Sequence, residues 1–312
     1  MLRVYKKALK DRHLRELRKP EKGCWIDLVD PIEEEVNRVL KFLNVPEDFV
    51  YSVLDEDEKP RVEKEGKALL VIIRVPTVED VGSKRLIRTL PLGIIITKTA
   101  ITTVCLKEVE ILYEFYVENV KNFFTTKRVR FFLQILKLTN QYYSRYLEMI
   151  EKEIEGMEKA ISRALRNEEI LRLLELQKTL IFFNTGIMGN QQVFKRVMEG
   201  KLLKLYEEDK DVLEDIIIDG EQALGTSKIL SDILSNTLDA YASIVSNNLS
   251  MIMKFLTSLT IILSIPTIIS SFYGMNVALP LQKNPNAFLI VSLISLIVSS
   301  LLFMIFWKRR WI

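Results

Sequence analysis

A short polar segment, Tyr273-Gly274-Met275-Asn276, lies between two long apolar stretches in the last part of the chain. The amide oxygen of Asn276 is a hard, uncharged ligand, which can hydrogen-bond the water shell of a divalent cation without the strong grip of a carboxylate. Gly274 lets the backbone leave a helix here, although Gly and Asn are also common in ordinary helix caps and turns. The position of the segment predicts the mouth of an ion pathway.

This segment belongs to an uncharged stretch that runs from Phe255 to Gln282, and a second uncharged stretch follows from Asn284 to Trp307. Each exceeds the ~20 residues that a helix needs to cross a bilayer. We predict transmembrane helices at 255–273 and 288–307, joined by an external loop at 274–287. The second stretch is followed by Lys308-Arg309-Arg310. The positive-inside rule therefore places the tail (308–312) in the cytoplasm, and two spans return the chain to the side on which it began, so both termini are cytoplasmic. The expected location is the inner or plasma membrane.

Small polar side chains form a stripe along the first apolar stretch and the residues just before it. They recur at alternating steps of four and three residues, the spacing of a heptad seam. Its members are Ser246, Ser250, Met253, Thr257, Thr260, Ser264 and Thr267. In a symmetric bundle this seam would face the shared axis and line a wet, uncharged pore, with Met253 and the adjacent Leu256 as candidates for a dewetting constriction. Ser and Thr also serve close helix packing in membranes, so the stripe alone leaves both interpretations open.

The charges are concentrated before the first span. Of the 44 basic residues only four follow Lys254, so residues 1–254 hold 40 basic and all 41 acidic side chains. This near-neutral balance gives no nucleic-acid footprint. Two cysteines and the single His13 provide neither a disulfide scaffold nor a Cys/His metal site or His-based catalysis. The acidic run 55–58 has no nucleophile or base arrangement nearby, so we do not expect an enzyme.

The N-terminal part has the pattern of an α/β domain at 1–127. Runs rich in β-branched residues predict strands at 24–29, 68–73, 92–97 and 100–105. Helical spacing then predicts an antiparallel hairpin within 128–208, with Asn167 capping its second helix. A third helix is expected from about 209 to Tyr273, comprising a cytoplasmic stalk at 209–254 and the first span. Gly220 and Gly225 count against an unbroken helix.

This third helix would be a rod of roughly 90 Å, since about 60 residues rise 1.5 Å each. A rod of that length cannot bury its surface within one small domain. We therefore expect the chain to associate with copies of itself.

The polar segment at the end of the first of two spans, together with the ending Lys308-Arg309-Arg310-Trp311, resembles the CorA family of magnesium transporters. The resemblance extends over the whole layout of the chain. It implies a funnel-shaped homopentamer in which the first spans form the pore and Asn276, with Tyr273, Gly274 and Met275, forms the outer mouth that binds hydrated Mg2+. It also implies Mg2+ influx down the electrochemical gradient, with Co2+ and Ni2+ as further candidate ions. No P-loop pattern for ATP is present.

The resemblance further implies acidic pairs between neighbouring protomers, which bind regulatory Mg2+ and hold the channel shut. By distance from the motif, Asp239 and Asp215 match acidic stalk residues of this kind, and Glu79 or Asp80 would face Asp215 from the neighbouring protomer. The sequence departs from the family in two places. The loop 277–286 has no acidic residue, and Ser250 occupies the inner pore position where some members have asparagine.

Two other functions remain open at this point. One is a related zinc transporter, but that branch of the resemblance would lead us to expect isoleucine in place of Met275. The other is a membrane-anchored sensor or scaffold, in which the apolar hairpin only anchors and oligomerises the chain. In that case Asn276 would be exchangeable without consequence.

Overall fold

The computed structural model describes the chain except residues 82–83, 161–166, 282 and 312, and it describes no side chains at 80–85 and 158–167. The chain divides into two compact units, residues 1–236 and 237–312, and each is described by itself.

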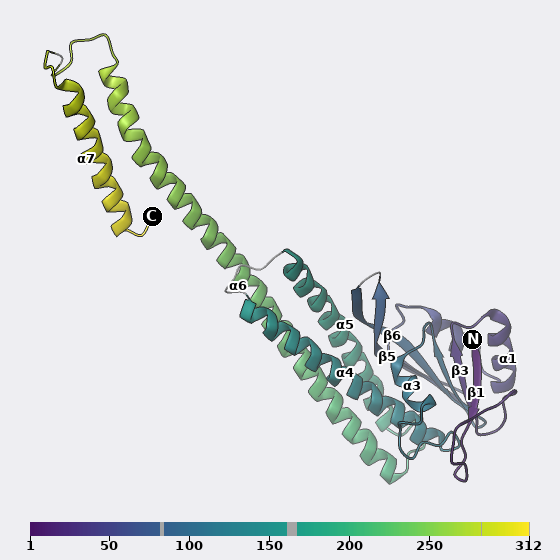
Figure 1. Ribbon diagram of the computed structural model, residues 1–312. Helices are drawn as coiled ribbons and strands as arrows, with labels where there is room; N and C mark the ends of the chain where they lie inside the picture. The colour runs from purple at the N-terminus through teal and green to yellow at the C-terminus, as the bar shows by residue number, and fades with distance from the viewer. Residues whose placement is uncertain (82–83, 161–166, 282, 312) are drawn as a thin grey trace. The chain divides into compact units, whose positions relative to one another are not determined.

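A seven-stranded mixed sheet forms the core of the first unit, with the strand order β2-β1-β3-β7-β6-β5-β4 (Figure 1). The strands are β1 (Leu2–Lys6), β2 (Arg15–Glu16), β3 (Trp25–Val29), β4 (Arg61–Glu65), β5 (Ala68–Val81), β6 (Lys84–Ile96) and β7 (Ile101–Cys105). Among these strands β3 and β7 pair in parallel and the other neighbours pair antiparallel. Every residue of β3 and β7 is buried, as expected for central strands covered on both faces.

One face of the sheet is covered by α1 (Glu33–Leu43), α2 (Asp48–Tyr51) and the 3-10 turn η1 (Ser52–Leu54). Beside Trp25, a cluster of aromatic rings includes Phe115 of α3 (Glu110–Tyr116), Phe131 of α4 (Arg128–Ala160) and Phe123 of the segment between these helices. The four predicted strands are present. The sequence patterns missed β1, β2 and β4. β2 and β4 are short and mostly polar, and basic residues interrupt the apolar ones in β1, so none of the three has a continuous apolar run.

The predicted helical hairpin is formed by α4 (Arg128–Ala160) and α5 (Asn167–Met198), which run side by side (Figure 1). Arg172 of α5 joins them, because its Nε and Nη2 donate to the two carboxylate oxygens of Glu153 at 2.5 and 3.0 Å. This two-point contact is the strong geometry for a guanidinium and a carboxylate.

The third helix, α6, runs from Glu207 to Tyr273 without interruption. Gly220 does not break it, and close packing explains the glycine: an added Cβ would lie 1.7 Å from Nε2 of Gln191. Gly225 lies on a different side of the helix, where an added Cβ would meet nothing within 4 Å. The helix propensity of one residue was therefore a poor guide here, since the packing of the buried residues of α6 outweighs a penalty of about 1 kcal/mol.

Asn190 fastens α5 to the edge of β5. The pairing of β4 with β5 begins at Arg61 opposite Ile72, so Arg74 lies beyond the reach of β4. The side-chain oxygen of Asn190 accepts the N–H of Arg74 at 2.8 Å, and its Nδ2 donates to the carbonyl oxygen of Arg74 at 2.7 Å. The buried amide of Asn190 thus takes the place of a neighbouring strand, satisfying both backbone groups of Arg74.

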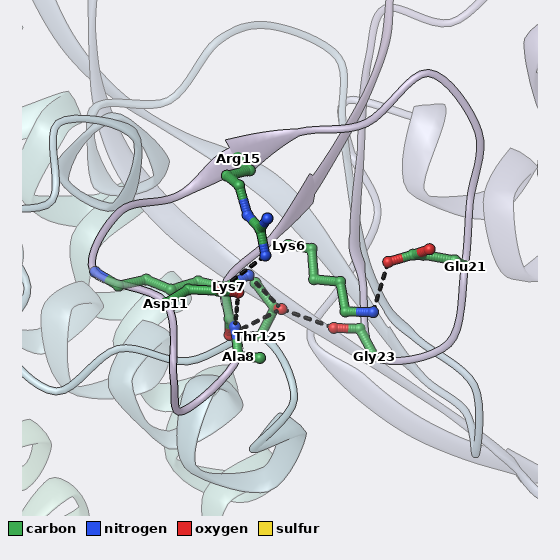
Figure 2. A network of polar contacts seen from close by, with 8 residues as sticks. All are labelled: Lys6, Lys7, Ala8, Asp11, Arg15, Glu21, Gly23 and Thr125. Carbon is green, nitrogen blue, oxygen red and sulfur yellow. Dashed lines mark hydrogen bonds and ion pairs between the residues drawn. The ribbon is translucent and has the colours of Figure 1, made fainter.

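The loop between β1 and β2 is held by polar contacts (Figure 2). The hydroxyl of Thr125 accepts the N–H of Lys7 at 3.0 Å and donates to the carbonyl of Gly23 at 2.7 Å. Asp11 of the loop pairs with Arg15 of β2 at 2.6 Å. Lys6, the last residue of β1, pairs at 2.5 Å with Glu21, which follows β2. These contacts fix the N-terminal strands against the start of α4.

Glu118 is a second anchor of this loop and gives a pH-dependent prediction. Hydrogen bonds from Lys7 Nζ at 2.6 Å and from His13 Nδ1 at 2.9 Å lower the pKa of Glu118 from 4.5 to about 2. A carboxyl group whose pKa is lower in the folded chain than in the unfolded chain stabilises the fold at pH values above the unfolded pKa. This stabilisation is lost as the pH falls from 4.5 towards 2. We expect Glu118→Gln to lower the urea midpoint of the detergent-solubilised chain at pH 7, and the difference from the native chain to shrink below pH 4.5. A difference that does not change with pH would contradict this role, and Glu16→Gln is the exposed control.

Candidate ion pathway

The second unit contains the end of α6 and α7 (Ala287–Lys308). Within the described residues, α6 and α7 are the two helices that are long and apolar enough to cross a membrane, by length and composition. In the most apolar stretch of each helix almost no residue is buried in the chain itself, so the apolar surface of these stretches is left uncovered. Such surface needs lipid or other protein around it.

One face of α6 contacts α7. Ser258 on this face is fully buried, its hydroxyl donates to the carbonyl of Lys254 at 2.7 Å, and Ser295 of α7 is 8% exposed. Towards the loop the two helices line an open pocket of about 850 Å3, to which α6 contributes Ile262, Pro266 and Ile269, among others. The side of α6 that carries Ser258, Ile262 and Ile269 therefore faces α7.

The predicted pore stripe lies on the opposite side of α6, because successive residues turn by about 100° around the helix axis. Within the chain, Ser246, Ser250, Met253, Thr257, Thr260 and Thr267 are exposed, while Ser264 is half-buried. Leu256 is exposed between the stripe and the α7 face. The chain thus leaves one uncharged, hydroxyl-bearing face of α6 uncovered.

Three hydroxyl groups of the stripe donate to their own helix. Thr260 donates to Leu256 at 2.8 Å, Ser264 to Ile261 at 2.8 Å and Thr267 to Leu263 at 3.2 Å, each time to a backbone carbonyl. A hydroxyl that donates in this way keeps its oxygen lone pairs available as acceptors. The face is therefore suited to meet the water shell of a cation, and the same bonds also fit simple packing in a membrane.

The polar segment follows directly on the end of α6 at Tyr273. The N–H of Gly274 donates to Ser270 at 3.0 Å, and the N–H of Met275 donates to Phe272 at 3.2 Å. Gly274 is not among the residues with positive φ, so the chain leaves the helix without the left-handed conformation that only glycine adopts easily. The hydroxyl of Tyr273 reaches the carbonyl of Pro280 at 3.4 Å and ties the loop back to the helix.

Asn276 is exposed at this end of α6. Its amide is therefore accessible to water and hydrated ions. Because α6 ends at Tyr273, Asn276 lies beyond the last turn of this helix.

The four acidic residues proposed for regulation have different surroundings. Asp215 and Asp239 are exposed on α6. Glu79 is only 11% exposed and forms ion pairs with Lys107 and, at 3.4 Å, with Arg88. The pKa of Lys107 is raised by its hydrogen bond to Glu79. The side chain of Asp80 lies outside the described residues.

The described part of a single chain has no group of three or more His, Cys, Asp or Glu side chains that could hold a metal ion. The sequence reasoning missed that Glu79 has two basic partners. Finding them would have required the register between β5 and β6, in which Glu79 lies opposite Leu86 and Arg88 is its diagonal neighbour. The other partner, Lys107, comes from the residues after β7.

An α/β domain, a long helix with an apolar end and a second apolar helix after it define the class of membrane proteins with a large water-exposed domain and a two-helix membrane hairpin. Residues 20–310 match the model of the family "CorA-like Mg2+ transporter protein", and the chain belongs to this family. Membership of a transporter family agrees with the expectation that the chain is not an enzyme.

The chain is 29% identical over 293 residues to the cobalt/magnesium transport protein CorA of Methanocaldococcus jannaschii, covering 92% of this chain and 91% of the relative. It is 21% identical over 295 residues to the protein of the same name from Thermotoga maritima, covering 92% and 83%. The complete structure of the M. jannaschii CorA magnesium transporter superposes with a TM-score of 0.86 at 26% identity, covering 100% of this chain and 99% of that one. The predicted fold class is thereby confirmed.

Proposed function

We propose that the chain is a Mg2+ channel of the inner or plasma membrane, working as a homopentamer with the hydroxyl-bearing face of α6 around the pore. The observation that supports this most is that face itself. It is uncharged, uncovered within the chain and opposite to α7, and it runs along a helix that ends at Tyr273, three residues before Asn276. Since two relatives are named cobalt/magnesium transport proteins, Co2+ is a further candidate substrate, and Ni2+ is another.

The residues suggest how a cation would pass. Hydrated Mg2+ docks at a ring of Asn276 amides, which hydrogen-bond its water shell. The loop has no carboxylate that could attract the ion, so this task falls to the amides. It then moves down its electrochemical gradient along the hydroxyl oxygens from Thr267 to Ser246. Met253 and Leu256 are exposed and apolar, and they form a constriction that excludes water when the helices approach one another.

We further propose that cytoplasmic Mg2+ closes the channel by bridging acidic residues of neighbouring protomers. Asp215 and Asp239 are accessible for this role. Glu79 could join only if Mg2+ displaces Lys107, since its carboxylate is already paired within its own chain. When the sites empty at low Mg2+, repulsion between unpaired carboxylates would loosen the stalk helices.

This regulation gives a specific prediction. We expect the double variant Asp215→Asn, Asp239→Asn to keep Mg2+ influx but to lose most of its inhibition by Mg2+ on the cytoplasmic side, because neutral amides bind the ion far less strongly. Influx into proteoliposomes is measured over a series of internal Mg2+ concentrations. Asp219→Asn is the matched control on the same helix. If the double variant is inhibited like the native chain, these two residues are not the regulatory site.

A competition assay tests the proposed ion. We expect excess external Zn2+ to leave most of the Mg2+ influx intact. Zn2+ uptake without Mg2+ uptake would instead support the zinc transporter, and uptake of neither ion would support a membrane-anchored sensor or scaffold.

A further inference from the structure

A buried carboxylate lies within the sheet of the first unit and takes no part in the candidate ion pathway. This group is Asp27 of β3, which is fully buried. In the strand pairing Asp27 has Arg3 of β1 directly opposite on one side and Thr103 of β7 on the other. Residues directly opposite one another in neighbouring strands point to the same face of a sheet. The three side chains therefore form one row across the sheet.

Two hydroxyl groups donate to the carboxylate of Asp27. Thr103 Oγ1 donates to Oδ1 at 2.5 Å, and the hydroxyl of Tyr116, the last residue of α3, donates to Oδ2. Thr103 Oγ1 in turn accepts the indole N–H of Trp25 at 2.8 Å. Because Thr103 is fully buried, its own hydrogen needs an acceptor, and Oδ1 of Asp27 provides it. Oδ1 is thereby fixed as an acceptor.

The buried charge of Asp27 has no paired cation. In the part of the chain that the structure describes, both side-chain partners of Asp27 are hydroxyl groups. Arg3 lies opposite, but its Nη2 pairs with Glu108 at 2.7 Å and its guanidinium lies over the ring of Tyr116. A buried carboxylate without a paired cation is costly in its charged form and takes up a proton more readily. Burial accordingly raises the pKa of Asp27, although the bonds from Thr103 and Tyr116 lower it.

Other titratable and charged groups face Asp27 from each element packed around it. They are Arg3 and Tyr5 of β1, Cys105 of β7, Glu108 of the loop after β7 and Tyr116 of α3. Burial raises the pKa of Tyr5, Cys105 and Tyr116, so these three groups keep their protons. Asp27 is therefore the buried member of the cluster whose charge can change below the pKa range of tyrosine and cysteine.

We propose that Asp27 is a proton-binding site that couples the pH around the domain to the way α3 is held at the sheet. One proton from water binds to Oδ2, because Oδ1 already accepts from Thr103. The new O–H points at Tyr116, whose hydroxyl changes from donor to acceptor and turns its own hydrogen away. Tyr116 is half-buried, whereas Trp25 and Thr103 are fully buried, so the proton enters past Tyr116.

The helix α3 is sensitive to this change because contacts between tyrosine hydroxyls and carboxylates fasten it. Besides the Tyr116 contact, Tyr142 donates to Glu114 at 2.8 Å and Tyr146 donates to Glu110 at 2.7 Å. These two bonds tie α3 to α4, and the Tyr116 contact ties it to β3. A hydrogen bond to a charged acceptor is roughly twice as strong as one between neutral groups. The charge of the buried carboxylate therefore changes how the end of α3 is held.

Infrared spectroscopy detects the proton directly, because the carbonyl stretch of a protonated carboxylic acid is separate from the bands of carboxylates and peptide groups. The detergent-solubilised full chain is followed from about pH 5 upwards, roughly one unit above the pKa of an exposed aspartate. We expect a carboxylic acid band that is present at the start and disappears as the pH rises. The band should be missing from Asp27→Asn. A native chain without such a band would overturn the proposal.

The fluorescence of Trp25 reports the coupling to α3. Its ring stacks on that of Tyr116 with the ring centres 5.0 Å apart, and its N–H bonds Thr103. Replacing Trp307 and Trp311 by phenylalanine leaves Trp25 as the only tryptophan of the chain. We expect its emission to titrate together with the infrared band. Emission that stays constant while the band titrates would refute the coupling.

Tyr116→Phe tests the proposed contact and does not depend on the folding of the Asp27 variant. We expect the midpoint of the titration to rise by about one pH unit, because the hydrogen bond from Tyr116 lowers the pKa of Asp27. Tyr113→Phe is the matched control, since Tyr113 is an exposed tyrosine on the same helix, and its midpoint should equal that of the native chain. A midpoint that Tyr116→Phe leaves unchanged would overturn the proposal. None of these measurements requires transport.

Discussion

Asn276→Ala is expected to reduce Mg2+ influx by more than about a hundredfold, since about 1 kcal/mol per lost hydrogen bond is multiplied over the subunits of the ring. The outer loop offers no carboxylate that could replace the amide. Asn276 is exposed at the end of α6, so the substitution should leave the fold intact. Influx into proteoliposomes measures the effect, and the assembly of the purified variant is checked in parallel.

Asn284→Ala is the matched control in the same loop. Asn284 accepts the N–H of Asn286 at 2.9 Å and therefore shapes the turn before α7 rather than the end of α6. We expect its effect on flux to be small. If Asn276→Ala conducts Mg2+ like the native chain, the amide is not part of the ion pathway, and the interpretation of the polar segment as a simple helix end would hold.

Asn190→Ala is expected to lower the free energy of unfolding by about 2–4 kcal/mol, because two buried backbone groups of Arg74 lose their partner at about 1–3 kcal/mol each. The carbonyl of Arg74 retains the hydroxyl of Tyr143 at 3.0 Å, so the N–H suffers the larger loss. Denaturant unfolding of the detergent-solubilised chain, followed by a signal from the α/β domain, measures the change.

The control for this prediction is Asn184→Ala, which removes the same side chain from the same helix. Asn184 makes a single longer contact, from Nδ2 to the hydroxyl of Ser231 at 3.3 Å, and its oxygen is unpaired in the described structure. We expect a clearly smaller loss of stability. Equal losses in the two variants would mean that the contact of Asn190 with the edge of β5 contributes little.

The membrane part and the long helix could be predicted from the sequence because their signals are strong and local. Two uncharged stretches of more than ~20 residues predict spans with little ambiguity. The absence of proline before Pro266 predicts an α6 that continues to Tyr273, as found. The four apolar strand segments were likewise visible in the sequence. They correspond to β3, β7, β6 and β5, which are adjacent in the sheet and have a neighbouring strand on both sides.

Features that depend on contacts distant in the sequence could not be predicted. The basic partners of Glu79 come from β6 and from the residues after β7. The role of Gly220 requires Gln191 of another helix, and the edge of β5 at Arg74 becomes visible only when the start of β4 is known. Propensity and periodicity are silent on such pairs. For the pore stripe, the sequence provided the spacing, and the structure added that its face is opposite to α7.

The most direct test of the central claim is gradient-driven Mg2+ influx into proteoliposomes that contain the purified native chain as the only protein. We predict uptake that follows the Mg2+ gradient, needs no ATP and increases when the inside is made electrically negative. Protein-free liposomes and the Asn276→Ala variant set the background. Uptake of Mg2+ no greater than this background, by a protein shown to be folded and inserted, would contradict the assignment of a Mg2+ channel.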